Sequence, residues 1–257
     1  MGNQIKVRIA ENSQAAANDV ASEFARAIQC KPSLILGLAT GGTPVEVYRK
    51  LVAMVQNGQV SFSDCTTFNL DEYVGLAPDH HQSYRHFMQS NLFDHVDVTA
   101  EKTHVPSGVA EDLYQECEDY EAAIRNEGGI DLQLLGIGEN GHIAFNEPGS
   151  EVKGRTSVVD LTENTIAANA RFFDTIDHVP RKAITMGIGT ILEASKIVLM
   201  ATGRNKATAV ARALSGGPGA DSPASYLQSG EDVTFVLDAD ASSELPDALI
   251  ESAEFIF

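Results

Sequence analysis

Along this chain, short apolar runs typical of β-strands alternate with stretches in which apolar residues recur at helical spacing. This pattern predicts strands and helices in alternation. Leu34–Leu38 is a continuous apolar run, typical of a parallel strand buried on both faces. Gln14–Ile28 instead places Ala and Phe on one face at helical spacing. The same periodicities predict further strands at Lys6–Ala10, Thr66–Leu70, Leu132–Gly136, Lys196–Ala201 and Val233–Leu237, and further helices at Val45–Val55, Gln82–Leu92, Glu111–Arg125 and Asn205–Leu214.

Strands that alternate with helices predict the α/β fold class, with an open, mostly parallel, doubly wound (Rossmann-like) sheet that carries helices on both faces. The 257 residues contain no internal repeat, low-complexity segment or linker-like boundary, so we expect a single domain over residues 1–257. In such sheets, ligands bind outside the carboxyl ends of the strands. The residues that follow each predicted strand are therefore the candidates for chemistry.

Charge and composition exclude several classes of partner. The chain has 36 acidic and 18 basic residues, and its net charge of -18 repels nucleic acid and anionic membranes. Its apolar runs are too short to cross a bilayer, and because residues 1–6 show no basic start followed by an apolar stretch, we expect no secretory signal. Because Cys30, Cys65 and Cys117 are far apart and lack Cys-x-x-Cys spacing, we expect no disulfide scaffold, no zinc site and a cytoplasmic location.

A turn with two glycines follows the strand that ends at Leu38. Gly41 and Gly42 allow the backbone to turn tightly and to approach a ligand closely. The free N–H groups at the start of the following helix bind anions, and the hydroxyls of Thr40 and Thr43 can add hydrogen bonds. The pattern therefore predicts a phosphate site, with a plain strand-to-helix turn as the alternative.

The same turn predicts how the helix begins. Thr43 is a favourable N-cap, Pro44 suits the first helical position, and Glu46 stands where a capping box requires it. The turn matches neither the Walker nor the Gly-x-Gly-x-x-Gly pattern, so it does not indicate a nucleotide. Arg171 and Lys206 are the candidate cations for the phosphate, although a lysine at such a position is more commonly a solvated surface residue.

Two further loops carry groups suited to proton transfer. Asp71 directly follows a predicted strand and is a candidate general base, with an Asp that caps a turn as the alternative. The glycine-rich loop at 136–148 brings His142 near Glu147, which could orient the imidazole and stabilise its charged form. Since the spacing is not His-Glu-x-x-His, we expect no metal.

Together these loops resemble the glucosamine-6-phosphate deaminase (glucosamine-6-phosphate isomerase) family. The resemblance implies an aldose–ketose isomerisation with deamination of glucosamine 6-phosphate to fructose 6-phosphate and ammonia. It also implies a role in amino-sugar and N-acetylglucosamine degradation, hydrolysis of a C–N bond and no cofactor. The matching stretches are residues 36–44, 68–76, 136–148, 169–173, 183–192 and 203–207.

The resemblance assigns roles to the candidate residues. It makes Asp71 the base that moves a proton between C2 and C1, and His142 the residue that opens the pyranose ring. Glu147 and Asn140 become the partners of His142, although some relatives carry Asp at the position of Asn140. The resemblance places the substrate phosphate on Thr40, Gly41, Gly42, Thr43, Arg171 and Lys206.

One departure concerns regulation. Some family members are hexamers that N-acetylglucosamine 6-phosphate activates through basic residues, and this chain has Ser157 and Val159 at two of those positions. The chain is also short at its C-terminus. It therefore resembles the short, unregulated branch, for which we expect a monomer or a small homo-oligomer with weak or absent activation.

Two other functions compete with this prediction. A 6-phosphogluconolactonase-like hydrolase shares the fold and the phosphate loop, but it typically has Ser-Leu-Phe-Pro where this chain has Phe145–Pro148, and Asp-Glu-Arg where it has Asp71–Tyr73. A non-catalytic sugar-phosphate sensor needs a DNA-reading module, and one α/β domain uses nearly the whole length. A small sugar phosphate remains the expected partner.

Overall fold

Eight parallel strands form the central sheet in a computed structural model that describes residues 5–256, apart from the side chains of Ala168 and Phe172. The strand order is β11-β1-β10-β9-β6-β2-β3-β5, and the paired strands of this sheet all run parallel. The predicted open, mostly parallel sheet is confirmed. Its strands are β1 (Lys6–Ala10), β2 (Ile35–Leu38), β3 (Thr66–Asn69), β5 (Thr103–His104), β6 (Leu132–Leu135), β9 (Lys196–Ala201), β10 (Val233–Asp238) and β11 (Glu254–Ile256).

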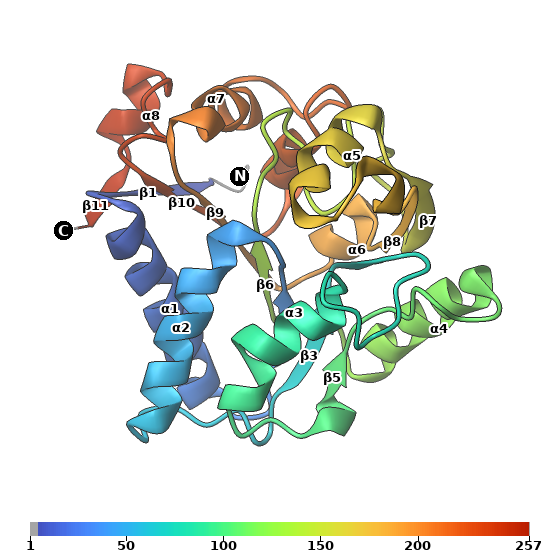
Figure 1. Cartoon of the computed structure of the whole chain (residues 1–257). Coiled ribbons are helices and arrows are strands. Elements are labelled where there is room, and N and C mark those ends of the chain that lie inside the picture. The colour runs from blue at the N-terminus through green and yellow to red at the C-terminus, as the bar shows by residue number, and fades with distance from the viewer. Residues whose placement is uncertain (1–4, 257) are drawn as a thin grey trace.

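Helices connect these strands in two groups. From β1 the chain crosses the sheet to β5 through the first group of helices, and it returns across the sheet to β11 through the second. Because the crossovers are right-handed, the two groups lie on opposite faces of the sheet. Figure 1 shows α1 and α2 side by side in front of the strands. The first group is α1 (Ser13–Cys30), α2 (Gly42–Gln56) and α3 (Tyr84–Asn91); the second is α4 (Leu113–Asn126), α6 (Ile188–Leu192), α7 (Ala207–Ser215) and α8 (Asp247–Glu251).

The central strands are buried on both faces. Leu36 of β2, Leu199 of β9 and Val236 of β10 are fully buried, which explains why these strands read as continuous apolar runs. Among these buried strand residues, Gly37 of β2 has no side chain. Gln133 of the neighbouring strand β6 lies opposite it and occupies the space that a side chain would need. A Cβ atom at Gly37 would stand 2.0 Å from Oε1 of Gln133, so a glycine is needed where this amide is buried.

The direction of the chain reverses between the neighbouring strands β2 and β6. From β2 the chain continues to β3 on one side, whereas from β6 it continues to β9 on the other. At such a switch point the loops leave toward opposite faces, and a crevice opens at the carboxyl ends of the strands. The loops that follow β2 and β6 are the glycine turn and the histidine loop, so the strand order alone brings these two predicted sites together.

A second, antiparallel sheet was not predicted from the sequence. It has the order β4-β8-β7, with β4 at Asp71–Tyr73, β7 at Ser157–Asp160 and β8 at Lys182–Thr185. Helix α5 (Glu163–Asn169) and the 3₁₀ turn η3 (Ala170–Phe172) lie between β7 and β8 in the sequence. Each of these strands has at most two consecutive apolar residues, which is too few to mark a buried strand, and their partners are distant along the chain.

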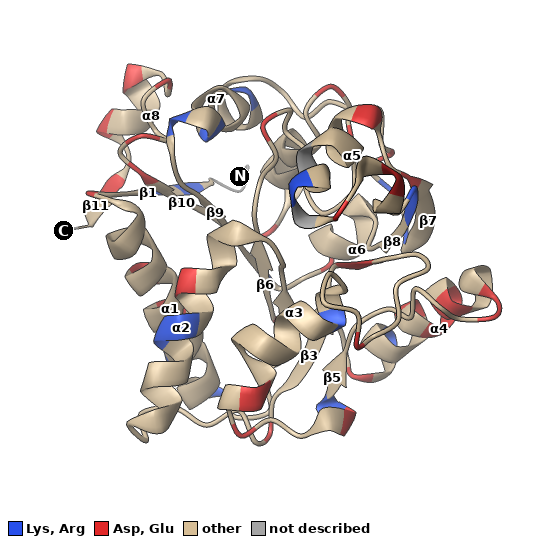
Figure 2. Cartoon of the chain, viewed as in Figure 1, with Lys and Arg blue, Asp and Glu red and all other residues tan. Residues whose placement is uncertain are grey.

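Acidic residues dominate the surface, and Lys and Arg are scattered among them (Figure 2). Several basic side chains pair with them, as Lys6 does with Asp232 and Lys31 with Asp131. The three cysteines are free thiols, of which Cys65 and Cys117 are buried and Cys30 is exposed. In the part of the chain that the structure describes, no helix has the length and apolar character needed to cross a bilayer.

Candidate active site

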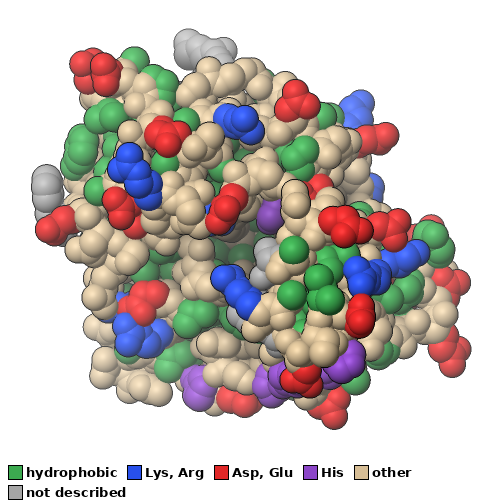
Figure 3. Space-filling model, turned by 45° about the horizontal axis from the view of Figure 1, so that its top comes forward, with side chains coloured by type: hydrophobic (Ala, Val, Ile, Leu, Met, Phe, Trp, Pro, Cys, Tyr) green, Lys and Arg blue, Asp and Glu red, His purple; other side chains and the backbone are tan. Residues whose placement is uncertain are grey.

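Four segments meet where β9, β6, β2 and β3 end, and these strands are consecutive neighbours in the sheet. They carry Lys206, the loop at 136–148, the turn at 40–43 and Asp71, respectively. The view that brings this end of the molecule forward shows a hollow with a histidine side chain in its wall (Figure 3). The strand order therefore collects groups from distant parts of the chain around one cleft.

The glycine turn starts helix α2 earlier than predicted. Gly41 is the N-cap and has a φ of +95°, a conformation that residues with a side chain rarely adopt. The prediction that Thr43 caps the helix, with Pro44 first and Glu46 in a capping box, is wrong: α2 begins at Gly42, and Glu46 pairs with Arg49 at 2.5 Å. Gly41 has no side chain with which to cap the helix, so the first N–H groups of α2 are suited to bind an anion.

A hollow of about 470 Å³ adjoins this helix start. Gly42 and Thr43 line it from α2, and Lys206 lines it from the 3₁₀ turn η5 (Arg204–Lys206) that follows β9. Burial lowers the pKa of Lys206; Glu139 opposes this shift, and the positive charge of Arg171 adds to it. Two cations near enough to repel each other beside a helix N-terminus make a site suited to an anion.

The segment that carries Lys206 is held by groups that the sequence did not point to. Both carboxylate oxygens of Asp238, at the end of β10, accept hydrogen bonds from the Gly203 N–H at 3.0 Å. Asn205 Nδ2 donates to Glu139 Oε1 at 2.7 Å and so ties this segment to the histidine loop. An Asp that directly follows a strand was the only sequence signal for Asp238.

Asp71 is buried, with 5% of its surface exposed, and its backbone pairs with Thr185 of β8. Burial raises the pKa of Asp71 to about 8, the charge of Glu72 adds to this, and the nearby Thr40 side chain opposes it. None of the described residues donates a hydrogen bond to Asp71 Oδ1. A carboxyl group with a pKa near neutrality and one unpaired oxygen is suited to general-base catalysis.

The histidine loop forms a closed network. Asn140 Nδ2 donates to Glu147 Oε2 at 2.6 Å, and Asn140 Oδ1 lies 2.8 Å from His142 Nδ1. Since that amide oxygen only accepts, Nδ1 carries the proton and the neutral ring keeps Nε2 as its proton acceptor. The same Glu147 oxygen lies 3.7 Å from Nδ1, where its charge can stabilise a protonated imidazole.

Glu147 is ionised throughout the physiological range. Its burial would raise the pKa of the carboxyl group, but interactions with His142, Thr165 and Asn140 outweigh burial and bring it to about 2. Asn140 cannot share a proton with the imidazole. Within this network, Glu147 therefore places a negative charge on the Nδ1 side of His142 across the physiological pH range.

Thr185 joins the two halves of the site. Its backbone pairs with Asp71, and its Oγ1 accepts a hydrogen bond from the Phe145 N–H at 3.1 Å, in the loop of His142. Asn146 Nδ2 donates to the Met186 carbonyl at 2.9 Å. One strand, β8, thus supports both the carboxylate and the histidine loop.

Tyr84 and Glu72 are site residues that sequence reasoning missed. Thr40 interacts with the Tyr84 phenol as well as with Asp71, and burial keeps the pKa of that phenol well above its usual value. Glu72 accepts hydrogen bonds from the Tyr84 and Arg85 N–H groups at 2.9 and 3.0 Å, which holds the start of α3 beside Asp71. No local pattern marks Tyr84, because only the pairing with Glu72 brings it to the cleft.

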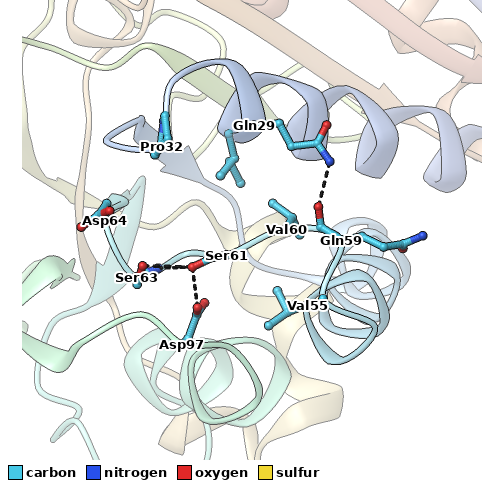
Figure 4. Close-up of a pocket in the computed structure, with 11 residues that line it drawn as sticks. Gln29, Pro32, Val55, Gln59, Val60, Ser61, Ser63, Asp64 and Asp97 are labelled. Atoms are coloured by element: carbon cyan, nitrogen blue, oxygen red, sulfur yellow. Dashed lines mark hydrogen bonds between the residues drawn. The ribbon is translucent and has the colours of Figure 1, made fainter.

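A second hollow of about 420 Å³ lies at the other end of the sheet, near the amino ends of β2 and β3 (Figure 4). Ser61 Oγ donates to Asp97 at 2.5 Å there, and Gln29 Nε2 donates to the Gln59 carbonyl at 2.8 Å. The described residues that line it include no His, Lys or Arg. Across residues 5–256 as described, no three metal-binding side chains gather. The cleft at the carboxyl ends is therefore the candidate active site.

A doubly wound parallel sheet with a helix start suited to an anion, a buried carboxyl group and a histidine held by an amide and an acid defines an α/β enzyme with a candidate site for a small anionic substrate. The model of the family described as glucosamine-6-phosphate isomerases/6-phosphogluconolactonase matches residues 8–236, and the chain belongs to this family.

Similar proteins narrow the comparison. The chain is 56% identical over 243 residues to a glucosamine-6-phosphate deaminase of Rhodopirellula baltica, covering 95% of this chain and 97% of that one. It is 48% identical over 252 residues to a deaminase of a Thermoanaerobacter species, covering 98% and 100%. A solved monomeric glucosamine-6-phosphate deaminase has a TM-score of 0.91 at 46% identity, covering 93% and 100%. The 6-phosphogluconolactonase from Trypanosoma brucei, with a TM-score of 0.77 at 20% identity, covering 95% and 99%, shares the fold.

Proposed function

We propose that this chain is a glucosamine-6-phosphate deaminase, which converts glucosamine 6-phosphate and water to fructose 6-phosphate and ammonia. The observation that carries the proposal is the network in which Asn140 and Glu147 hold His142 beside the cleft that also contains Asp71. Deaminases at 46–56% identity over nearly the full length support it. The 6-phosphogluconolactonases have only about 20% sequence identity to this chain, and this similarity supports a shared fold.

Recognition begins with the phosphate. The N–H groups at the start of α2, the hydroxyls of Thr40 and Thr43, and the cations of Arg171 and Lys206 would bind it. A phosphate carries about -1.5 to -2 charges at pH 7, so charge-assisted hydrogen bonds from two cations are the strongest anchors available here. Anchoring one end of the substrate aligns the reacting carbons with the catalytic side chains.

Ring opening falls to His142. Its Nε2 takes the proton of the C1 hydroxyl and delivers a proton to the ring oxygen, so the C1–O5 bond breaks and the aldehyde forms. The Glu147 anion stabilises the imidazolium that exists between these two transfers, and Asn140 keeps the ring in place. No net proton is consumed in this step.

Isomerisation falls to Asp71. Its carboxylate removes the proton from C2 while the aldehyde oxygen gains a proton and the C2 ammonium group loses one, which gives an enolamine. The carboxylate then returns its proton to C1, which leaves a protonated imine at C2, and water hydrolyses this imine to the ketone and ammonia. The substrate ammonium group at C2 favours the ionised carboxylate, because an opposite charge nearby lowers the pKa of an acid. Binding of the aminosugar thus prepares the base that acts on it.

The remaining attributes follow the same proposal. We place the activity in N-acetylglucosamine degradation in the cytoplasm, where free thiols such as Cys30, Cys65 and Cys117 persist. The chemistry needs no cofactor. The similarity to a monomeric deaminase supports a monomer as the active form.

The direct test follows two products from purified protein. Ammonia release from glucosamine 6-phosphate is expected, and acid release from 6-phosphogluconolactone is expected to stay at the uncatalysed rate. Lactone hydrolysis without ammonia would establish the rival hydrolase. Tight binding of glucosamine 6-phosphate without turnover of either compound would indicate a sensor.

Lys206→Gln is expected to raise the KM for glucosamine 6-phosphate by about 10- to 100-fold, with a smaller effect on kcat. A hydrogen bond to a charged group contributes roughly 1.5–3 kcal/mol, and the phosphate is bound before and during the reaction. Lys102→Gln is the matched control, because Lys102 binds the Ser63 carbonyl at the opposite end of the sheet. An unchanged KM in the Lys206 variant would remove this lysine from the phosphate site.

A further inference from the structure

The second oxygen of the Glu147 carboxylate is bound by helix α5. Thr165 Oγ1 donates to Glu147 Oε1 at 2.5 Å, and Thr162 Oγ1 lies 3.3 Å from the same oxygen. Thr162 Oγ1 also lies 3.0 Å from Thr165 Oγ1. Each hydroxyl has one proton, so the arrangement that satisfies the most groups runs from Thr162 to Thr165 to Glu147.

The two threonines have different structural roles. Thr162 is the N-cap of α5, and its side chain accepts a hydrogen bond from the Thr165 N–H at 3.2 Å. The Thr165 hydroxyl does not cap the helix, and the proton that it donates goes to Glu147. Its removal should therefore leave the start of α5 intact.

The carboxylate of Glu147 thus bridges two parts of the site. Its Oε2 contacts Asn140 and, through it, His142, whereas its Oε1 contacts α5. Only 15% of its side chain is exposed, so little water competes for these oxygens. Helix α5 continues directly into η3, which carries Arg171.

Helix α5 is itself seated on the small sheet. Ile166 of α5 is buried in an apolar cluster with Tyr73 of β4, Phe145 of the histidine loop and Ala183 of β8. This packing gives Thr165 a defined position relative to Glu147. The contact between them is therefore set by the tertiary structure and does not depend on a loop conformation alone.

Resting on the proposed function, we propose that Thr165 is a positioning residue: its hydroxyl holds the Glu147 carboxylate against Asn140, keeps His142 aligned for ring opening, and ties this network to the segment that carries Arg171. The nearest sequence signal is a Thr in the first turn of a helix, which by itself indicates only local hydrogen bonding.

Thr165→Val tests this role, because valine keeps the branched shape and removes the hydroxyl. The kcat for ammonia release is expected to fall about tenfold, since one hydrogen bond to a charged group is lost, with little change in KM. The pKa of Glu147 is expected to rise with the loss of this donor, but the carboxylate stays ionised near neutral pH, so the fall in kcat is expected at every pH of the assay. Thr165→Ser should restore both properties, and Asn164→Val, at an exposed neighbouring position of α5, is the matched control.

A double-mutant cycle separates positioning from a structural effect. If Thr165 acts through Glu147, Thr165→Val should have no further effect on kcat in a Glu147→Gln background. A wild-type kcat in the Thr165→Val variant, or an equal loss in both backgrounds, would overturn the inference. Failure of the proposed function has a different signature, because the wild-type protein itself would then release no ammonia.

Discussion

Asp71→Asn is expected to lower ammonia release by about 10²- to 10⁴-fold, and exchange of the C2 hydrogen of the substrate with solvent should fall in parallel. An amide has the shape of the carboxyl group but cannot accept the C2 proton. Binding of the sugar phosphate should persist, because the residues proposed to bind the phosphate lie on other elements. The measurements are ammonia release, hydrogen exchange in deuterated buffer and the dissociation constant of glucosamine 6-phosphate.

The same substitution is expected to stabilise the fold near neutral pH. The folded-state pKa of Asp71 is about 8, against 3.8 as its ordinary value, so between these values the folded protein holds a proton that the unfolded chain has released. Stability contributed by this group therefore falls as pH rises, by up to about 1.36 kcal/mol per pH unit. Asparagine carries no such dependence, so the advantage of the variant should widen from pH 5 to pH 8.

Thermal unfolding across that pH range checks this second effect. Asp240→Asn, at an exposed position, is the matched control for the substitution itself and should leave activity unchanged. A buried carboxyl group that lowers stability, as expected of Asp71, fits the common compromise between stability and activity. Persistence of C2 exchange in the Asp71 variant would refute the role of Asp71 as the base.

Gly138→Ala is expected to reduce kcat by a factor comparable to the loss of a general acid–base group, about 10²- to 10⁴-fold. The imidazole of His142 lies directly against Gly138, and a Cβ atom there would stand 2.2–2.4 Å from three ring atoms. The ring can rotate away, so the fold should survive while the proton-transfer group leaves its position. Activity and thermal unfolding, measured together, distinguish these two effects.

Gly136→Ala is the matched control for this prediction. It lies at the start of the same loop, where a Cβ atom would meet nothing within 4 Å, so near wild-type activity is expected. An active Gly138→Ala variant would show that the position of the His142 ring is not critical. Equal losses in both variants would instead point to general damage to the loop.

Local patterns predicted much of the main sheet. The strands at Lys6–Ala10 and Lys196–Ala201 match the prediction, and the five predicted helices are present with ends shifted by up to three residues. The pattern succeeded because a strand buried on both faces and a helix buried on one differ in period within a single segment. The start of α2 was predicted wrongly, because the favourable cap at Thr43 yielded to the tighter turn that Gly41 permits.

The candidate site was predictable by residue type and by place. Asp71, His142 and Lys206 each follow a strand, and the strand order makes those strand ends neighbours. The supporting residues were not predictable, because Tyr84, Thr165 and Asp238 reach the site through partners far away along the chain. Hydrogen bonds such as that between Thr165 and Glu147 leave no trace in the spacing of either residue.

By itself, the sequence determined the alternation of elements, the glycine turn, and which loops carry an acid, an imidazole and cations. These features depend on residues close together in the sequence. They could be predicted from one sequence because local sterics and apolar periodicity act over that short range. Only the tertiary structure decided that β4 pairs with β8, that the Thr40 side chain interacts with Asp71, and that α5 donates a hydrogen bond to Glu147. Those contacts, and the burial that sets the pKa of Asp71, arise when distant segments pack together and exclude water.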